Sequence, residues 1–488
     1  MKKALIFVHK WLGVGLALLF LMWFASGIVM FYVPFPSLTQ DERLAGMPPL
    51  RLEGACCLSA ADAAARAGIA FTDARLGMHG QRPVWRMQGA DKRWITVDAA
   101  GAGMLAPLTD AQAADVAERF SGRRAVRAER LERDQWTVSQ GYNPHRPLVR
   151  VALDGDDGLT LYVSPGASEV VLDTRRAERA WNWVGAVPHW LYFTQLRRWP
   201  DLWRQVVVWL SLPGVVLAAS GVVLGVWQLW LNRNRWIPYR KFWWRWHHIL
   251  GLAGGVTCVT WILSGLLSMN PFDVFSPRGA TPRERAAWIG EEAVAVLDPA
   301  RALALAPLAA REIDLVRLQG QVWYRLRGAG SQALVPAGAV AGPALRALPD
   351  AAIGDALRGL RSGAGAPALE RVTRYDGLYY SREPAGAAGT SSMPLPVWRA
   401  HWPDGVALYA DPATARLLLR TDPGTPWQRV LYNGLHSFDF APLMARPVLR
   451  GVLVVGLSLL GLVLCMTACV LAWRVLVPAR RRKARDAV

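Results

Sequence analysis

Four apolar stretches of membrane-spanning length constrain the fold of this chain more than any other feature of its sequence. They cover residues 4–31, 206–231, 246–269 and 452–473. About 20 consecutive apolar residues cross the hydrocarbon core of a bilayer. We therefore predict a multi-pass α-helical membrane protein with four transmembrane helices. The first stretch is longer than the apolar part of a signal peptide, so we interpret it as an uncleaved anchor.

Short basic segments flank these stretches and carry most of the net charge of +19. Their basic residues are Lys2, Lys3 and Lys10; Arg233, Arg235, Arg240, Lys241 and Arg245; and Arg474, Arg480, Arg481, Arg482, Lys483 and Arg485. Such segments beside apolar stretches mark the cytoplasmic side of a membrane. We expect both termini to be cytoplasmic, in a bacterial inner membrane, with the lipid bilayer and not nucleic acid as the partner of the basic residues.

This topology predicts the domain boundaries. We expect transmembrane helices at 1–32, 204–232, 246–270 and 451–474, periplasmic domains at 33–203 and 271–450, a cytoplasmic loop at 233–245 and a basic cytoplasmic tail at 475–488. The two periplasmic segments contain strand-like runs, such as residues 84–87, 93–97 and 159–163, between Gly- and Pro-rich turns. Ala-rich stretches such as 59–68 are predicted as short helices, so both domains are expected to be α+β.

The two halves of the chain repeat each other. A His-x-x-x-Gly motif starts at His9 and at His247; a Trp follows 14 residues later and a Ser-Gly pair 17 residues later in both copies. Outside these helices, residues 83–86 resemble residues 321–324, and His189 precedes Pro200 by the same 11 residues that separate His436 from Pro447. We predict a tandem duplication with a period of about 240 residues.

Four of the eight histidines fall at matched positions of this duplication. His9 and His247 lie near the predicted cytoplasmic ends of the first and third helices, and His189 and His436 precede the second and fourth. An ionisable side chain at membrane depth is a candidate functional residue, and two imidazoles facing each other across a helix bundle are what bis-histidine ligation of a haem iron requires. His248 is the alternative to His247.

The type of haem follows from what the sequence lacks. It contains no C-x-x-C-H motif for covalent attachment, so b-type haem is implied. The competing interpretation makes these histidines ordinary interfacial residues. His79, His145 and His401 have no matched partners and are interpreted as surface residues. Cys56 and Cys57 are adjacent, so a vicinal disulfide is possible but not established by the sequence. No catalytic residue is identified.

The sequence resembles the PepSY-associated transmembrane family of bacterial inner-membrane proteins. The resemblance is carried by the two His-x-x-x-Gly helices with their Ser-Gly pairs and by a PepSY-like stretch at residues 84–98, and it covers nearly the whole chain. The family includes iron-regulated proteins, among them ferric-siderophore reductases with two b-type haems. The resemblance thus implies two haem b groups, with His9, His247, His189 and His436 as axial ligands of the iron.

The function expected from these features is electron transfer through two haems to a periplasmic ferric siderophore in iron acquisition, which would make the chain an oxidoreductase. The electron donor is left open between a cytoplasmic reductase and a membrane quinol. The alternative is a non-catalytic PepSY membrane protein that binds peptides or regulates a peptidase. A transporter is disfavoured, because the predicted helices carry no intramembrane carboxylates.

Overall fold

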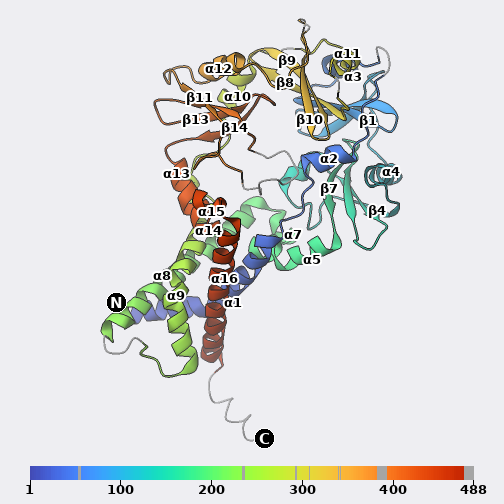
Figure 1. The fold of residues 1–488 in the computed structure, drawn as a ribbon. Helices are drawn as coiled ribbons and strands as arrows, with labels where there is room; N and C mark the ends of the chain where they lie inside the picture. The colour runs from blue at the N-terminus through green and yellow to red at the C-terminus, as the bar shows by residue number, and fades with distance from the viewer. Residues whose placement is uncertain are drawn as a thin grey trace. The chain divides into compact units, whose positions relative to one another are not determined.

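The chain forms two compact units, each built from both halves of the sequence (Figure 1). The computed structural model describes residues 1–52, 56–232, 237–291, 294–306, 308–338, 340, 342–381 and 393–477. The first unit contains the long helices and consists of Met1–Phe35, Ala177–Phe275 and Thr425–Val488. The second unit contains the sheets and consists of Pro36–Arg176 and Ser276–Gly424.

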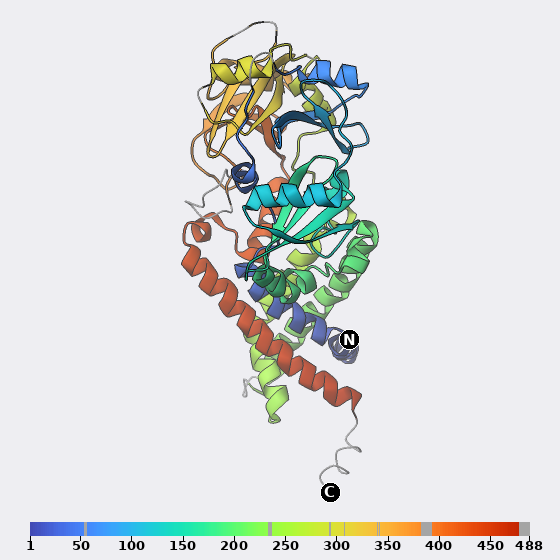
Figure 2. The same cartoon turned by 90° about the vertical axis from the view of Figure 1, so that its right-hand side faces the viewer.

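Four long apolar helices make up most of the first unit. They are α1 (Lys2–Tyr32), α8 (Pro200–Leu231), α9 (Phe242–Ser268) and α16 (Pro447–Leu476). Each is long and apolar enough to cross a membrane, which confirms the four predicted helices and is compatible with a multi-pass membrane protein. α1 packs against α16, and α8 packs against α9 (Figure 2). α8 and α16 begin four residues before their predicted starts, each at a proline. Proline lacks an N–H, which costs nothing there because the N–H groups of the first helical turn have no partner within the helix.

Short helices lead into α8 and α16 and complete this unit. Before α8 these are α5 (Arg176–Val184), α6 (Ala186–His189) and α7 (Thr194–Arg197). Before α16 they are α13 (Thr425–Gln428), the π-helix η3 (Arg429–Gly434), α14 (Leu435–Ser437) and α15 (Ala441–Met444). One turn, η2 (Pro271–Asp273), follows α9. The segments that carry His189 and His436 thus belong to the helical unit, not to the sheets.

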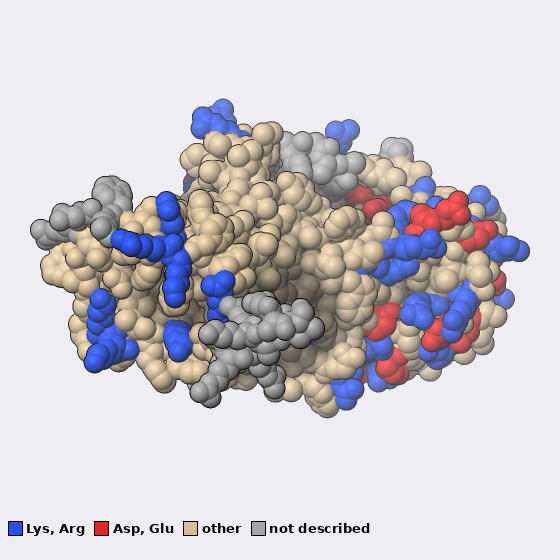
Figure 3. Space-filling model, turned by 90° about the horizontal axis from the view of Figure 1, so that it is seen from below, with Lys and Arg blue, Asp and Glu red and all other residues tan. Residues whose placement is uncertain are grey.

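Basic side chains mark the ends of the long helices. Lys3, Lys10, Arg240, Lys241, Arg245 and Arg474 are exposed at the start of α1, the start of α9 and the end of α16. In Figure 3 several blue side chains stand apart from red ones, whereas blue and red side chains are intermixed elsewhere on the same face. Arg233, Arg235, Arg480, Arg481, Arg482, Lys483 and Arg485 lie outside the described residues.

A six-stranded antiparallel sheet joins the two repeats within the second unit. Its strand order is β10-β9-β8-β1-β2-β3. The first repeat contributes β1 (Asp73–His79), β2 (Arg82–Gln88) and β3 (Trp94–Asp98); the second contributes β8 (Glu312–Leu318), β9 (Gln321–Gly328) and β10 (Ser331–Pro336). β1 pairs with β8 through Leu76 and Ile313, both fully buried. The segments 33–203 and 271–450, expected as one domain each, therefore share a sheet and a core.

Each repeat also forms a four-stranded antiparallel sheet covered by a helix. The sheet of the first repeat consists of β4 (Ala125–Leu131), β5 (Leu148–Leu153), β6 (Thr160–Ser164) and β7 (Glu169–Thr174), and its helix is α4 (Asp110–Ser121). The sheet of the second repeat consists of β11 (Ala368–Val372), β12 (Val397–His401), β13 (Ala407–Asp411) and β14 (Arg416–Thr421), and its helix is α12 (Asp350–Gly359). The remaining helices are α2 (Gln40–Gly46), α3 (Ala60–Ala67), η1 (Gln140–His145), α10 (Pro282–Ile289) and α11 (Pro299–Leu305).

The strand register corrects the sequence match between the repeats by one residue. The sequence pairs residues 83–86 with 321–324, which sets Trp85 opposite Trp323. In the structure Arg86 faces Arg75 and Arg325 faces Asp314 across equivalent strand pairs, so Trp85 corresponds to Tyr324. A shift of one residue moves a strand side chain to the other face of its sheet. Trp85 and Tyr324 accordingly share one core, whereas Trp323 packs in another.

A buried ionic cluster ties the two repeats together beside this sheet. Glu312, which is fully buried, accepts from Arg43 Nη2 at 2.8 Å and pairs with Arg327. Glu169 accepts from Arg43 Nη1 at 3.0 Å and from Arg75 Nη2 at 2.8 Å. Burial raises the pKa of Glu169, but the charges of the surrounding arginines lower it to about 2. Both carboxylates are therefore ionised at neutral pH.

Candidate functional site: two histidine pairs in the helical unit

The matched histidines meet in two pairs, each with one member from each repeat. His9 of α1 and His247 of α9 form the first pair, and their ring centroids lie 6.3 Å apart. His189, the last residue of α6, and His436 of α14 form the second, with ring centroids 6.2 Å apart. Two imidazoles that bind one metal ion from opposite sides, each at about 2 Å, place their ring centres about 6 Å apart. Both pairs have this spacing.

The two pairs lie near opposite ends of the bundle. α1 contributes to both, through His9 in its third turn and through Ser26, whose hydroxyl lies 3.2 Å from His189 Nδ1. The 17 residues from His9 to Ser26 correspond to about 25 Å of helix axis. The buried side chains of Phe20 and Phe24 fill the interval on α1. An apolar core therefore separates the pairs by most of the thickness of a hydrocarbon layer, about 30 Å.

Each histidine presents Nδ1 to a hydroxyl on a neighbouring long helix. The Nδ1-to-oxygen distances are 3.2 Å for His9 and Ser220, 3.2 Å for His189 and Ser26, 3.0 Å for His247 and Thr467, and 3.0 Å for His436 and Ser264. The arrangement repeats with the duplication, because α8 and α16 serve the first pair while α1 and α9 serve the second. Nδ1 of His9 also lies 3.1 Å from the carbonyl of Leu217, and Nδ1 of His189 3.1 Å from that of Trp23.

These contacts assign the tautomer of all four rings. Each hydroxyl already donates its hydrogen to a carbonyl of its own helix: Ser26 to Met22, Ser220 to Leu217, Ser264 to Trp261 and Thr467 to Leu464. A hydroxyl whose hydrogen is engaged accepts a further bond, so we assign the imidazole hydrogen to Nδ1. The lone pair then lies on Nε2, as in a neutral histidine that binds a metal while its other nitrogen donates to a second group.

Small residues leave room for the rings. A Cβ atom added at Gly221 would lie 2.7 Å from Cε1 of His9, and one at Gly27 would lie 3.2 Å from Cε1 of His189. At Gly265 the distance to Cε1 of His436 would be 3.7 Å. Each of these glycines directly follows the hydroxyl residue that bonds the same histidine. These glycines thus leave room for the imidazole rings, and each pair offers two neutral imidazole nitrogens, a donor set that suits a haem iron.

His248, the alternative to His247, lies in a different environment. It is His247 whose ring lies beside that of His9. The His248 ring packs edge-on against Tyr239, with centroids 5.3 Å apart, and its side chain is buried. Successive residues of an α-helix point about 100° apart, so the two histidines face different sides of α9. The structure therefore brings His247 to the pair.

The unmatched histidines belong to the sheet unit. His401 is exposed, as expected from the sequence. His145 differs from that expectation: it is half-buried, stacks on Trp94 with centroids 6.2 Å apart, and lies 3.2 Å through Nδ1 from Ser164. Burial lowers the pKa of His145 to about 4. His79 is also half-buried. Among the described residues no group of three or more His, Cys, Asp or Glu side chains is arranged to hold a metal ion directly.

Sequence reasoning missed two of the four hydroxyl residues. Ser26 and Ser264 stood out as landmarks of the repeat, but Ser220 and Thr467 did not. A signal was present, since each lies 31 residues after the preceding matched histidine, His189 or His436. Serine and threonine are common in transmembrane helices, where they bond to their own backbone. Their second role became visible only from the packing of the helices.

Comparison with known proteins adds nothing to this geometry. No model of a known protein family matches the chain, and no characterised protein matches it. The family resemblance drawn from the motifs therefore stays an expectation, and a functional proposal depends on the two histidine pairs themselves.

Proposed function

We propose that this chain is an inner-membrane electron-transfer protein that holds two b-type haems, one at each histidine pair, and reduces a ferric chelate of the siderophore type in the periplasm. The observation that carries the proposal is the meeting of His9 with His247 and of His189 with His436 at the spacing of bis-imidazole ligation. A single buried histidine has many structural explanations. Two alike pairs, each with one histidine from each repeat and all four rings in the same tautomer, have few structural explanations.

The residues of the chain hold and orient the ligand nitrogens. When bound, haem supplies a one-electron couple inside the low-dielectric bundle. Ser220 and Thr467 accept the Nδ1 hydrogens of His9 and His247, which fixes the tautomer of both rings and leaves the Nε2 lone pairs available as ligands. Ser26 and Ser264 do the same for the second pair. The apolar core around Phe24 excludes water between the pairs.

Two haem sites in series would divide electron transfer across the membrane into two shorter steps. An electron donor, either a cytoplasmic reductase or a quinol, would act at the His9–His247 end, where basic residues flank the helices. The ferric chelate would be reduced at the His189–His436 end. Hard oxygen ligands hold Fe³⁺ more tightly than Fe²⁺, so reduction would release the iron from the chelate.

The test is a reduced-minus-oxidised absorption spectrum of the purified full-length protein with a haem assay. We expect a low-spin b-type spectrum after dithionite, two haems per chain, and reoxidation of both on addition of a ferric hydroxamate chelate. A colourless protein that was supplied with haem during expression would overturn the proposal and favour the non-catalytic alternative. Haem that dithionite reduces but no ferric chelate reoxidises would remove the substrate assignment alone.

Substitution of Gly221 by alanine is expected to disturb the first pair without touching the second. The added methyl group would lie 2.7 Å from Cε1 of His9, so the ring has to move. Overpacking of this kind costs about 1–3 kcal/mol, and we expect haem affinity at this site to fall accordingly. Titration of the apoprotein with haem measures the effect. Gly456→Ala is the matched control, because a Cβ there meets no atom within 4 Å; equal losses in both variants would contradict the assignment.

A further inference from the structure

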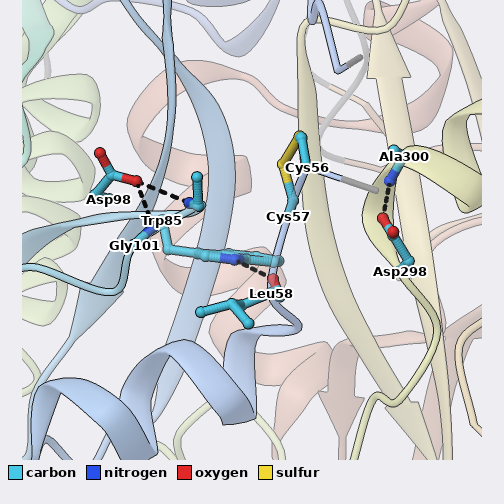
Figure 4. Close-up of a disulfide and its surroundings, with 9 residues drawn as sticks. Cys56, Cys57, Leu58, Trp85, Asp98, Gly101, Asp298 and Ala300 are labelled. Atoms are coloured by element: carbon cyan, nitrogen blue, oxygen red, sulfur yellow. Dashed lines mark hydrogen bonds between the residues drawn. A yellow bond between two sulfur atoms is a disulfide. The ribbon is translucent and has the colours of Figure 1, made fainter. Parts of the chain in front are cut away.

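A disulfide joins two adjacent residues, Cys56 and Cys57, at the edge of the shared core of the sheet unit. Cys57 is buried and Cys56 is partly exposed. Figure 4 shows the disulfide next to Leu58, whose carbonyl accepts a 2.9 Å hydrogen bond from the indole of Trp85, and near the Asp298–Ala300 turn of the second repeat. The bond thus lies where both repeats contribute to one core.

The second repeat builds the same turn without cysteines. Ser59 caps α3, and Asp298 caps α11 at the equivalent position. Leu58 accepts from Trp85, and Leu297 accepts from Tyr324 Oη at 3.0 Å. The residues that correspond to the two cysteines are therefore Ala295 and Val296. The fold of this turn does not depend on a covalent link.

A disulfide between neighbours also has little entropy to remove from the unfolded chain. The stabilisation that a crosslink gives through loop closure grows with the number of residues enclosed. This ring encloses only the two cysteines themselves. A purely structural role is therefore weak on two independent grounds, which leaves the redox chemistry of the bond.

We infer that Cys56–Cys57 is a reversible thiol–disulfide site that exchanges electrons with a dithiol reductant, independently of any haem. A thiolate of the reductant attacks Cys56, the more exposed residue; the S–S bond breaks, and the Cys57 sulfur leaves and takes a proton. The second thiol of the reductant then displaces Cys56 and closes the reductant's own disulfide. Two electrons and two protons pass to the protein, which gains two thiols.

Reduction of the disulfide would change the packing of the core beside it. Trp85 is fully buried, and its ring lies 6.4 Å from that of Tyr324, so the two repeats pack together at this point. Opening the ring at Cys56 and Cys57 frees the backbone next to the Leu58 carbonyl that Trp85 holds. The redox state of the pair is thus coupled to the contact between repeats.

The test is differential alkylation of the folded full-length protein followed by peptide mass spectrometry. Without reductant, iodoacetamide is expected to leave Cys56 and Cys57 unmodified; after dithiothreitol, both should be alkylated without denaturant, and diamide should restore protection. Labelling before any reduction would overturn the inference, as would reduction that succeeds only in urea.

A double variant separates a redox role from a structural one. Cys56→Ser with Cys57→Ser is expected to shift Tm by no more than about 2 °C, because the ring encloses so short a loop. It should also abolish any change in hydrogen exchange around Trp85 on addition of dithiothreitol. A large loss of stability would show that the bond is a structural crosslink and would overturn the inference.

Discussion

Replacement of His9 by alanine is expected to reduce the haem content from two per chain to one. The variant removes one of the two proposed axial ligands at the first pair, where the His9 and His247 rings lie 6.3 Å apart, and leaves the second pair intact. The helix should still form, because alanine is the most favourable residue in a helix interior. A haem assay together with the low-spin electron paramagnetic resonance signals of the two sites measures the loss. His247→Ala should give the same result.

His248→Ala is the matched control for this prediction. It changes the neighbouring residue on the same helix, but the His248 ring packs on Tyr239. Both haems should be retained. If His248→Ala lost a haem while His247→Ala kept both, His248 would be the ligand and the observed pairing would not be the functional one. If His9→Ala retained both haems, the ligand assignment would fail.

Substitution of Glu312 by glutamine is expected to destabilise the sheet unit by about 3–5 kcal/mol. Burial alone raises the pKa of Glu312, but the charges of Arg43, Arg327 and Arg75 outweigh it and lower the pKa well below its usual range. Loss of the carboxylate therefore leaves arginine charges buried without compensation. Urea-dependent hydrogen exchange of the amides in β1 and β8 measures the local free energy of unfolding.

The control for this substitution is an ion pair on the surface. Asp355 and Arg358 pair on α12 while the Asp355 side chain is 76% exposed. Asp355→Asn should change stability by less than about 1 kcal/mol. Similar effects of the two substitutions would mean that Glu312 contributes as an ordinary hydrogen-bonding residue and not through its charge.

The helical unit was largely predictable from the sequence, because apolar length and repeat spacing are local signals. The four transmembrane helices follow from their composition. The partners of His9 and His189 were inferred from matched spacing, since a duplicated helix pair tends to place equivalent residues at equivalent depths. The matched spacing to the following glycine favoured His247 over His248, which stayed an alternative because both lie within one turn; the packing of α9 brings His247 beside His9.

The sheet unit was less accessible, because its organisation depends on long-range pairing. Nothing local in β1 indicates that its free edge pairs with β8. The sequence match of Trp85 with Trp323 was attractive because the residue types agree, yet the packing places Tyr324 at that position. The hydroxyl partners of the histidines were missed for a similar reason, since a serine in an apolar helix looks the same whether or not a second group bonds to it.

The pairing of β1 with β8 also imposes an order on biosynthesis. Asp73 and Glu312 are 239 positions apart, with α8 and α9 between them in the chain. At about 5–20 residues per second, the ribosome needs on the order of tens of seconds to produce the missing partner strand. During that interval the edge of β1, with Leu76 at its centre, has no strand beside it. We therefore expect the first half expressed alone, which leaves this strand edge unpaired, to be prone to aggregation.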